Sequence, residues 1–212
     1  MPSLQKPSVE SNRRFLTAQS KLPFSYSTVG ATATTPPAGY VVDHTRIKLG
    51  DGESVFHSAK AALQRWEHFN LGWVEVWPPN VPIKSGEVVA ILGRAGRLWW
   101  LNSCRIVYVV DESGLISKFG FAYGTLPGHA ESGEERFMIE WDRGENTVWY
   151  DILAFSRPNH FLARLAYPMT RSTQKQFGRD SAAAMLKAAN GSSSIPEIRQ
   201  VTGCPPVQAQ VS

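Results

Sequence analysis

Residues Glu135–Phe155, ERFMIEWDRGENTVWYDILAF, carry the strongest structural signal in the chain. In the first half, the apolar Phe137 and Ile139 alternate with Arg136, and a period of two is typical of a β-strand with one buried face. A second β-prone run follows after a short turn that contains Gly144. We therefore predict a β-hairpin in which Gly144 supplies the positive φ angle of the turn.

Similar short runs precede this hairpin, and turn residues separate them. An alternating strand is expected over Tyr40–Leu49, and an amphipathic helix over Glu53–Phe69. A long C-terminal helix should end near Ala189, with a break near Tyr167 because Pro168 lacks an N–H donor. The remaining expected strands are 73–77, 87–92, 98–110 and 118–123.

This order predicts an α+β fold, in which a curved antiparallel sheet of about 6–7 strands packs on the C-terminal helix. One further helix follows the first strand. We expect a flexible segment over residues 1–22, in which 13–20 can form a short helix, a single domain over 23–190 and a disordered tail over 191–212. A cavity forms between sheet and helix where packing between them is incomplete.

Composition excludes several classes of protein. With 212 residues, 42% of them hydrophobic and 19% charged, the chain can bury a core and is neither collagen-like nor wholly disordered. Its two cysteines form no zinc pattern or disulfide framework, so we expect a cytoplasmic location. The net charge of +4 is mild, and the bases of 157–187 follow the acids of 131–151, with which they can pair. No nucleic-acid partner is therefore predicted.

The densest group of polar residues is FGFAYGTLPGHAESGEE, residues 119–135. An imidazole near a carboxylate can act as a pH-tuned acid or base, so Tyr123, His129 and Glu131 are the candidate catalytic residues. The alternative is a hydrogen-bonded strand connection beside a solvated acidic loop. Glu134 and Glu135 are neighbours on an expected strand, so their side chains should face opposite ways.

Two further features belong to the candidate site. Trp99 and Trp100 should point to opposite faces of one strand, with one of them in the core. Arg105 lies in an apolar strand and would need a carboxylate partner, for which Asp151 and Glu135 are candidates. The predicted ligand-binding residues are Trp99, Arg105, Tyr123, Thr125, His129, Glu135 and Asp151.

No metal ion or cofactor is expected. His129, Glu131 and Asp151 lack a diagnostic ligand spacing. The other histidines are scattered along the chain, and we expect surface or helix-capping roles for them. They are His44, His57, His68 and His160.

The block FGFAYGTLPGHAESGEERF, followed by VWYDILAFSRPNHFLARLAYPMTRSTQKQF, resembles the uncharacterised family known as domain of unknown function nineteen-ninety. The resemblance runs from about Phe24 to Ala189 and includes GYVVDHTRIKLGDG and the W-x-x-F segment at Trp66. The order of elements also resembles the helix-grip fold of the START and Bet v 1 proteins. The resemblance assigns no catalytic residue, because the family has no established activity.

The helix-grip resemblance implies binding of a small apolar or amphipathic molecule under the last helix. A second hypothesis is an enzyme that acts on such a molecule through Tyr123 and His129. A third is membrane association or channel activity, because plant relatives have been described at the plastid outer envelope. Membrane contact is not favoured, because the strands lack the lipid-facing alternation of membrane barrels. The sequence leaves the oligomeric state open.

Overall fold

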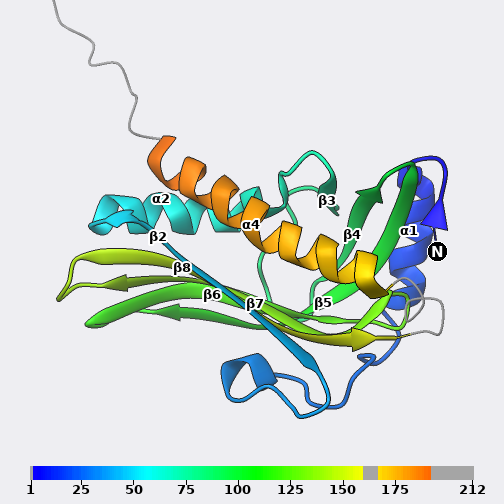
Figure 1. The fold of residues 1–212 in the computed structure, drawn as a ribbon, viewed down its shortest axis with the longest axis horizontal. Helices are drawn as coiled ribbons and strands as arrows, with labels where there is room; N and C mark the ends of the chain where they lie inside the picture. The colour runs from blue at the N-terminus through cyan, green and yellow to red at the C-terminus, as the bar shows by residue number, and fades with distance from the viewer. Residues whose placement is uncertain (1, 160–166, 192–212) are drawn as a thin grey trace, which may run out of the picture.

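A computed structural model describes residues 2–159 and 167–191. In these ranges the chain forms one antiparallel sheet with helices on both faces (Figure 1). The elements are β1 (Pro2–Ser3), α1 (Val9–Gln19), η1 (Ala31–Ala33), β2 (Val41–Asp51), α2 (Glu53–Gln64), η2 (Glu67–Phe69), β3 (Val74–Trp77), β4 (Val88–Ala95), β5 (Leu98–Glu112), β6 (Ile116–Thr125), β7 (Glu131–Asp142), β8 (Thr147–Pro158) and α4 (Tyr167–Gly191).

The strand order is β2-β8-β7-β6-β5-β4-β3, and β1 pairs with β5. Consecutive strands from β3 to β8 are neighbours, whereas β2 crosses over to pair with β8. Helices α2 and α4 lie on one face, which we call the inner face (Figure 1). This arrangement confirms the predicted α+β helix-grip architecture, with β1 as an additional strand.

The predicted hairpin is confirmed, but its turn geometry differs from the prediction. Asn146, and not Gly144, has the positive φ angle, at 55°. The carboxylate of Asp142 accepts hydrogen bonds from the backbone N–H groups of Gly144 and Glu145, at 2.9 and 3.1 Å. The Asp142 side chain therefore closes the first part of the turn. Asn146 follows with a left-handed backbone, a conformation that asparagine tolerates.

Helix α2 ends earlier than its apolar periodicity predicts. Trp66 has a left-handed backbone (φ 60°), and the chain continues as the short η2. The indole of Trp66 is buried, and its Nε1 donates a hydrogen bond to the carbonyl oxygen of Val81 at 2.8 Å. Tertiary packing of this indole therefore offsets the cost of the left-handed backbone.

The N-terminal region belongs to the fold to a greater extent than the sequence predicted. Helix α1 starts at Val9, where Ser8 caps it by accepting a hydrogen bond from the N–H of Ser11. Leu16 packs against Leu92 and Leu101 on the outer face of β4 and β5. The predicted break near Tyr167 and the predicted tail over 191–212 involve residues outside the described ranges. Of these segments, α4 is described from Tyr167 onward and ends at Gly191, the first residue of the predicted tail.

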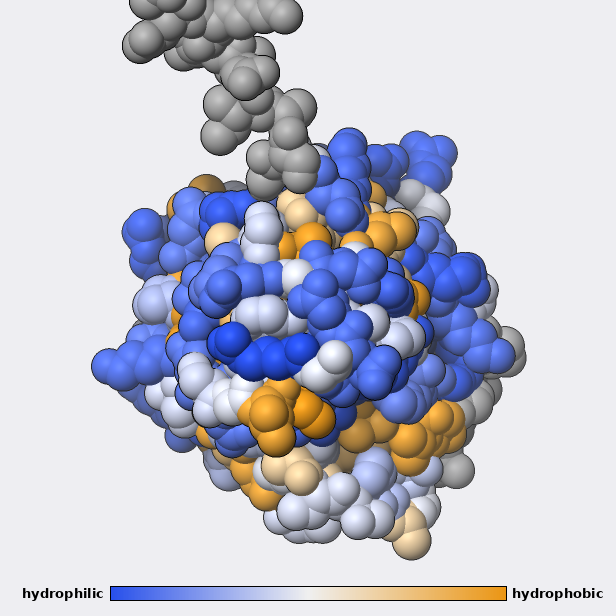
Figure 2. All heavy atoms as spheres, turned by 90° about the vertical axis from the view of Figure 1, so that its left-hand side faces the viewer, coloured by the Kyte–Doolittle hydropathy of each residue, from blue (hydrophilic) through white to orange (hydrophobic). Residues whose placement is uncertain are grey.

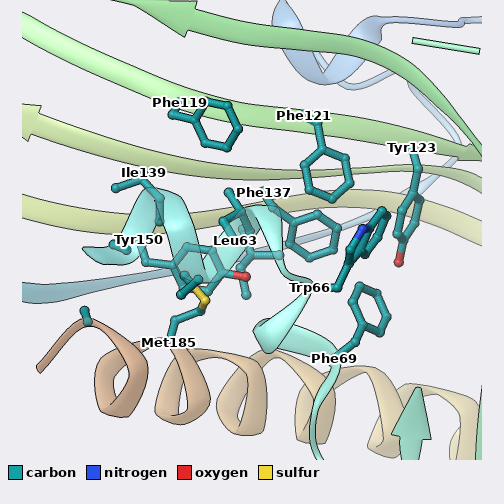
Figure 3. Packing of buried hydrophobic residues seen from close by; sticks show 14 of the residues in the cluster. Leu63, Trp66, Phe69, Phe119, Phe121, Tyr123, Phe137, Ile139, Tyr150 and Met185 are labelled. Atoms are coloured by element: carbon teal, nitrogen blue, oxygen red, sulfur yellow. The ribbon is translucent and has the colours of Figure 1, made fainter. Parts of the chain in front are cut away.

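The main core fills the half of the inner face that α2 and the C-terminal half of α4 cover. Leu63 and Tyr150 lie beside Met185 there, and Phe121 packs beside Trp66, with their ring centroids 4.9 Å apart (Figure 3). The hydroxyl groups of Tyr150 and Ser181 lie 3.0 Å apart and join the sheet to α4 by a buried hydrogen bond. These contacts fix α4 across the sheet.

A carboxylate attaches the segment before β2 to the outer face of the sheet. Glu134 is 2% exposed and accepts hydrogen bonds from the Tyr26 hydroxyl (2.6 Å), the Gly30 N–H (2.7 Å) and the Thr32 N–H (2.9 Å). The Thr32 hydroxyl donates a further one. A carboxylate without a cation is stable in such a place because several donors satisfy its oxygens.

No helix in the described ranges is long and apolar enough to cross a membrane. Figure 2 shows the end of the molecule that carries the β7–β8 turn, where a mainly hydrophilic surface is broken by small, separate hydrophobic areas.

The surface or capping role predicted for His68 is wrong. His68 is fully buried, and its ring stacks on Trp66 and lies 4.6 Å from the ring of Phe137. Neither of its ring nitrogens has a hydrogen-bond partner in the described structure. Burial lowers the pKa of His68 to about 3, so the ring is neutral in the folded protein.

The buried His68 predicts a specific sensitivity to acid. Because its pKa is lower in the folded than in the unfolded state, stability is fully present above about pH 6.5 and declines as the pH falls below that value. The loss approaches about 1.4 kcal/mol per pH unit, or about 2 kcal/mol between pH 8 and pH 5. We expect His68→Phe to remove this part of the loss, as measured by urea denaturation at both pH values.

The matched control is His57→Phe, because His57 lies on the exposed side of α2. Equal pH dependence in wild type and His68→Phe would show that His68 does not contribute.

Candidate functional site

A cavity of about 1250 Å³ opens between the inner face and the N-terminal half of α4. It lies beside the main core, at one end of the sheet. At this end β5 and β6 are no longer paired, because their pairing begins at Cys104 and Thr125. Helix α1 borders the cavity there through Phe15 and Gln19. The volume exceeds the range of about 300–1,000 Å³ that is typical of small-molecule sites.

Aromatic and aliphatic side chains form much of the wall. The rings of Phe69 and Phe177 lie 5.0 Å apart, and the ring of Tyr123 lies 6.2 Å from that of Phe69. In Figure 3, Phe69 and Tyr123 stand at the margin of the packed core, and the Tyr123 hydroxyl points away from β6 toward α4. Ile91, Trp100 and Ile152 continue the apolar wall.

Tyr123 and Glu135 form the polar centre of the site. They are direct cross-strand partners on β6 and β7, and the Tyr123 hydroxyl donates a hydrogen bond to Oε2 of Glu135 at 2.7 Å. Burial raises the pKa of Glu135 to about 7, and the nearby Glu131 and Asp43 act in the same direction, against the Tyr123 hydrogen bond. The carboxyl group is therefore close to half-protonated at neutral pH.

A second polar group joins α4 to the sheet at the edge of the cavity. The side-chain amide of Gln174 donates hydrogen bonds to Glu131 Oε2 (2.5 Å) and to the Ser156 hydroxyl (2.9 Å). Burial raises the pKa of Glu131 to about 6, although the hydrogen bonds that Glu131 accepts from Gln174 and from the Ser156 hydroxyl lower it. Beside them, Arg171 forms a two-point ion pair with Asp43 of β2.

His129 lines the same cavity from the β6–β7 connection. Its Nδ1 accepts a hydrogen bond from the backbone N–H of Glu131 at 2.9 Å, so the neutral ring carries its proton on Nε2. Burial lowers the pKa of His129 to about 4. The enzyme hypothesis instead expected a carboxylate to orient this ring.

The structure brings together five of the candidate site residues and places the other three elsewhere. Tyr123, Thr125, His129, Glu131 and Glu135 border the cavity. Trp99, Arg105 and Asp151 do not border it. Trp99 packs beside α1 and β1, with the Lys6 ammonium 5.4 Å from its ring. Trp100 faces the cavity. Neither indole is fully buried, so the expectation that one of them lies in the core is not met.

The expected pairing of Arg105 with Asp151 or Glu135 is wrong. The Arg105 guanidinium donates hydrogen bonds to the backbone carbonyls of Ser20 (2.8 Å) and Leu22 (2.9 Å), and it lies 5.2 Å from the ring of Phe24. Ile106 belongs to the inner core, so Arg105 faces outward and away from Glu135, and β6 and β7 lie between Arg105 and the strand of Asp151.

Asp151 instead lies on the outer face. Burial by itself would raise its pKa, but hydrogen bonds from His44 (2.7 Å), Arg136 (2.8 Å) and Arg46 (3.1 Å) outweigh burial and hold it below its usual value. Its role is to pair β2, β7 and β8 across that face.

Close packing explains the glycines in the 119–135 block. A Cβ at Gly124 would lie 2.1 Å from the Tyr26 hydroxyl, and one at Gly133 would lie 1.9 Å from the carbonyl oxygen of Phe155. These positions need glycine because a ring and a neighbouring strand come close to the backbone.

Sequence reasoning missed the contributions of Asp43, Arg171 and Gln174. They are far apart in the chain and meet only because α4 crosses β2 and β7. Phe177 also borders the cavity, and its place there follows from where α4 lies.

The position of Arg105 predicts the effect of its removal. Arg105→Ala loses two hydrogen bonds from a half-buried guanidinium to backbone carbonyls but leaves no carboxylate unpaired. We expect a loss of about 1–2 kcal/mol in the free energy of unfolding, measured by chemical denaturation. Arg97→Ala in the exposed β4–β5 turn should cost under about 0.5 kcal/mol. A loss of about 3–5 kcal/mol for Arg105→Ala would instead indicate a buried ion pair.

Comparisons with known proteins agree with the sequence resemblance. The family described as "Domain of unknown function (DUF1990)" matches residues 25–184. A UPF0548 protein of Dictyostelium discoideum is 38% identical over 213 residues, covering 92% of this chain and 98% of the relative. A UPF0548 protein of Arabidopsis thaliana is 40% identical over 158 residues, 73% of this chain and 76% of the relative. Human STARD10 aligns with a TM-score of 0.43 at 11% identity, over 86% of this chain and 81% of that structure. The chain therefore belongs to the DUF1990 family.

Proposed function

We propose that this protein binds a small amphipathic molecule in the cavity between the inner face and α4. The observation that carries the proposal is the cavity itself, a space of about 1250 Å³ with a largely apolar wall into which polar groups such as Tyr123 and Glu135 are set. Binding sites for small molecules have this composition, because apolar area supplies affinity and polar groups fix the orientation.

The division of the inner face into two halves supports this function. Under the C-terminal half of α4, Met185 and Ala189 pack against the core. Under the N-terminal half, Phe177 packs beside Phe69 and borders the open space. A helix fixed at one end can cover a cavity at the other without collapse of the sheet onto it.

Acid–base catalysis on the bound molecule is a second candidate function. The observation that favours it is the carboxyl group of Glu135, whose pKa of about 7 is close to that of an efficient general acid or base. Tyr123 would hold this carboxyl group in position through its hydrogen bond. The activity of Glu135→Gln toward any ligand that the protein converts would test this role.

Membrane association is less well supported. The outer face at β2, β7 and β8 carries charged groups, with Arg46 bonded to both Glu140 and Asp151. Liposome flotation at physiological salt provides the test, and we expect the protein to stay in the soluble fraction.

A pair of neighbouring residues on β8 allows a matched test of binding. Ala154 borders the cavity opposite Glu135, whereas Leu153 is the partner of Arg136 on the outer face. Ala154→Phe should place a ring in the cavity and weaken binding of a suitable ligand at least about tenfold, which corresponds to about 1.4 kcal/mol. Leu153→Phe should leave the affinity unchanged.

Thermal-shift screening of lipids, polyketides and isoprenoids identifies the ligand, and calorimetry measures its affinity for the three proteins. Equal binding by wild type and Ala154→Phe would place the ligand outside the cavity and contradict the proposal.

A further inference from the structure

We propose that the ligand is a cation, an amphipathic amine whose ammonium group binds between Glu135, Tyr123 and the rings of Phe69 and Phe177. This inference rests on the proposed function and goes further by specifying the chemistry of the ligand. It derives from a difference between the two faces of the sheet in how many hydrogen-bond donors each buried carboxylate has.

The carboxylates on the outer face have full sets of hydrogen-bond donors, which are basic side chains at Asp151 and neutral groups at Glu134. Asp151 has Arg136, Arg46 and His44 as donors, and Glu134 accepts from four separate groups. At these two carboxylates, which link parts of the fold, the chain therefore supplies several hydrogen-bond donors to each carboxylate group.

Among the described residues, Glu135 and Glu131 at the cavity have fewer donors, and these are neutral. Glu135 accepts from the Tyr123 hydroxyl, and Glu131 from Gln174 and Ser156. A carboxylate has room for about four hydrogen bonds, so Glu135 keeps acceptor capacity that its bond to Tyr123 does not use. It borders the cavity, so a ligand can reach it.

A hydrogen-bond donor that carries positive charge suits this environment best. In a medium of low polarity, an ion pair with an ionised carboxylate is worth more than a neutral hydrogen bond. Such a cation would also offset the cost of ionising Glu135, whose raised pKa means that stability is lost as the pH rises through about 7.

The aromatic wall is an independent feature that favours a cation. Phe69 and Phe177 both line the cavity with their rings 5.0 Å apart, and Tyr123 adds a third ring beside them. The faces of aromatic rings attract ammonium groups by about 0.5–2 kcal/mol each, depending on how well water is excluded.

The cations that border the cavity do not cancel this preference. Arg94, Lys175 and Arg179 are exposed, so water and salt screen their charge. Arg171 is paired with Asp43. The titratable and charged groups around Glu135 are Tyr123 on β6, Glu131 on β7, Asp43 on β2, Cys104 on β5, Tyr150 on β8, His129 on the connection, and Arg171, Lys175 and Arg179 on α4.

Three probes with the same tail and different heads test the inference: n-decylamine, n-decanol and sodium decanoate. We expect calorimetry at pH 8 to give at least about tenfold tighter binding of decylamine than of decanol. At pH 5.5, where Glu135 is protonated, this preference should fall about tenfold or more, whereas decanol should bind equally at both values. The wild-type measurement requires no variant to fold.

Glu135→Gln supplies the second test, because glutamine can still accept the Tyr123 hydrogen bond. The variant should lose the preference for decylamine and its pH dependence while it retains decanol binding. Glu145→Gln in the exposed β7–β8 turn removes the same charge and should behave like wild type.

The possible outcomes separate this inference from the proposed function. Tightest binding of decanoate, or equal binding of decylamine and decanol at pH 8, would overturn the cation assignment and leave the binding function intact. Failure of all three probes, together with no hit in the ligand screen, would count against the binding function itself.

Discussion

The structure depends on the register of β7, which places two adjacent carboxylates on opposite faces of the sheet. Glu134 faces outward and fixes the segment from Tyr26 to Thr32, while Glu135 faces inward to the cavity. A slip of one residue would reverse every side chain on the strand. It would bring Phe137 to the outer face and bury Arg136 in the core. The hydrogen bonds to Glu134 therefore stabilise both the outer segment and the arrangement of the cavity.

Packing is distributed unevenly along α4, and this separates stability from the candidate site. The C-terminal half of the helix is fixed by Met185, by the bond between Ser181 and Tyr150, and by Asn190, which donates to the carbonyl of Leu49. The N-terminal half contacts the sheet through Phe177, whose ring lies 6.2 Å from that of Phe137, and otherwise through polar pairs at the edge of the cavity. Polar pairs of this kind can exchange partners with water or a ligand at smaller cost than a packed core can be opened.

Local patterns were sufficient for much of the fold but not for the contacts that cross it. Alternation at Phe137 and Ile139 predicted β7 and its hairpin, and it predicted the opposite orientation of Glu134 and Glu135. The end of α2 at Trp66 and the burial of His68 depend on tertiary packing that no local period records. The partner of Arg105 was predicted incorrectly because no local pattern gives the order of the strands, in which β6 and β7 separate Arg105 from Asp151. The polar residues of the 119–135 block indicated the cavity, whereas Asp43 and Arg171 meet only in the folded chain.

The contrast between Asp151 and Glu135 bears on the origin of the site. Both are acidic residues in strands that are paired on both sides. Around Asp151 the chain supplies three basic partners, and the pKa falls. Around Glu135 it supplies a tyrosine, two further carboxylates and apolar rings, and the pKa rises. A sequence selected for stability alone would replace Glu135 with a neutral residue, since an ionised carboxylate there lowers stability at neutral pH. Departures from local optimality of this kind are expected at functional sites.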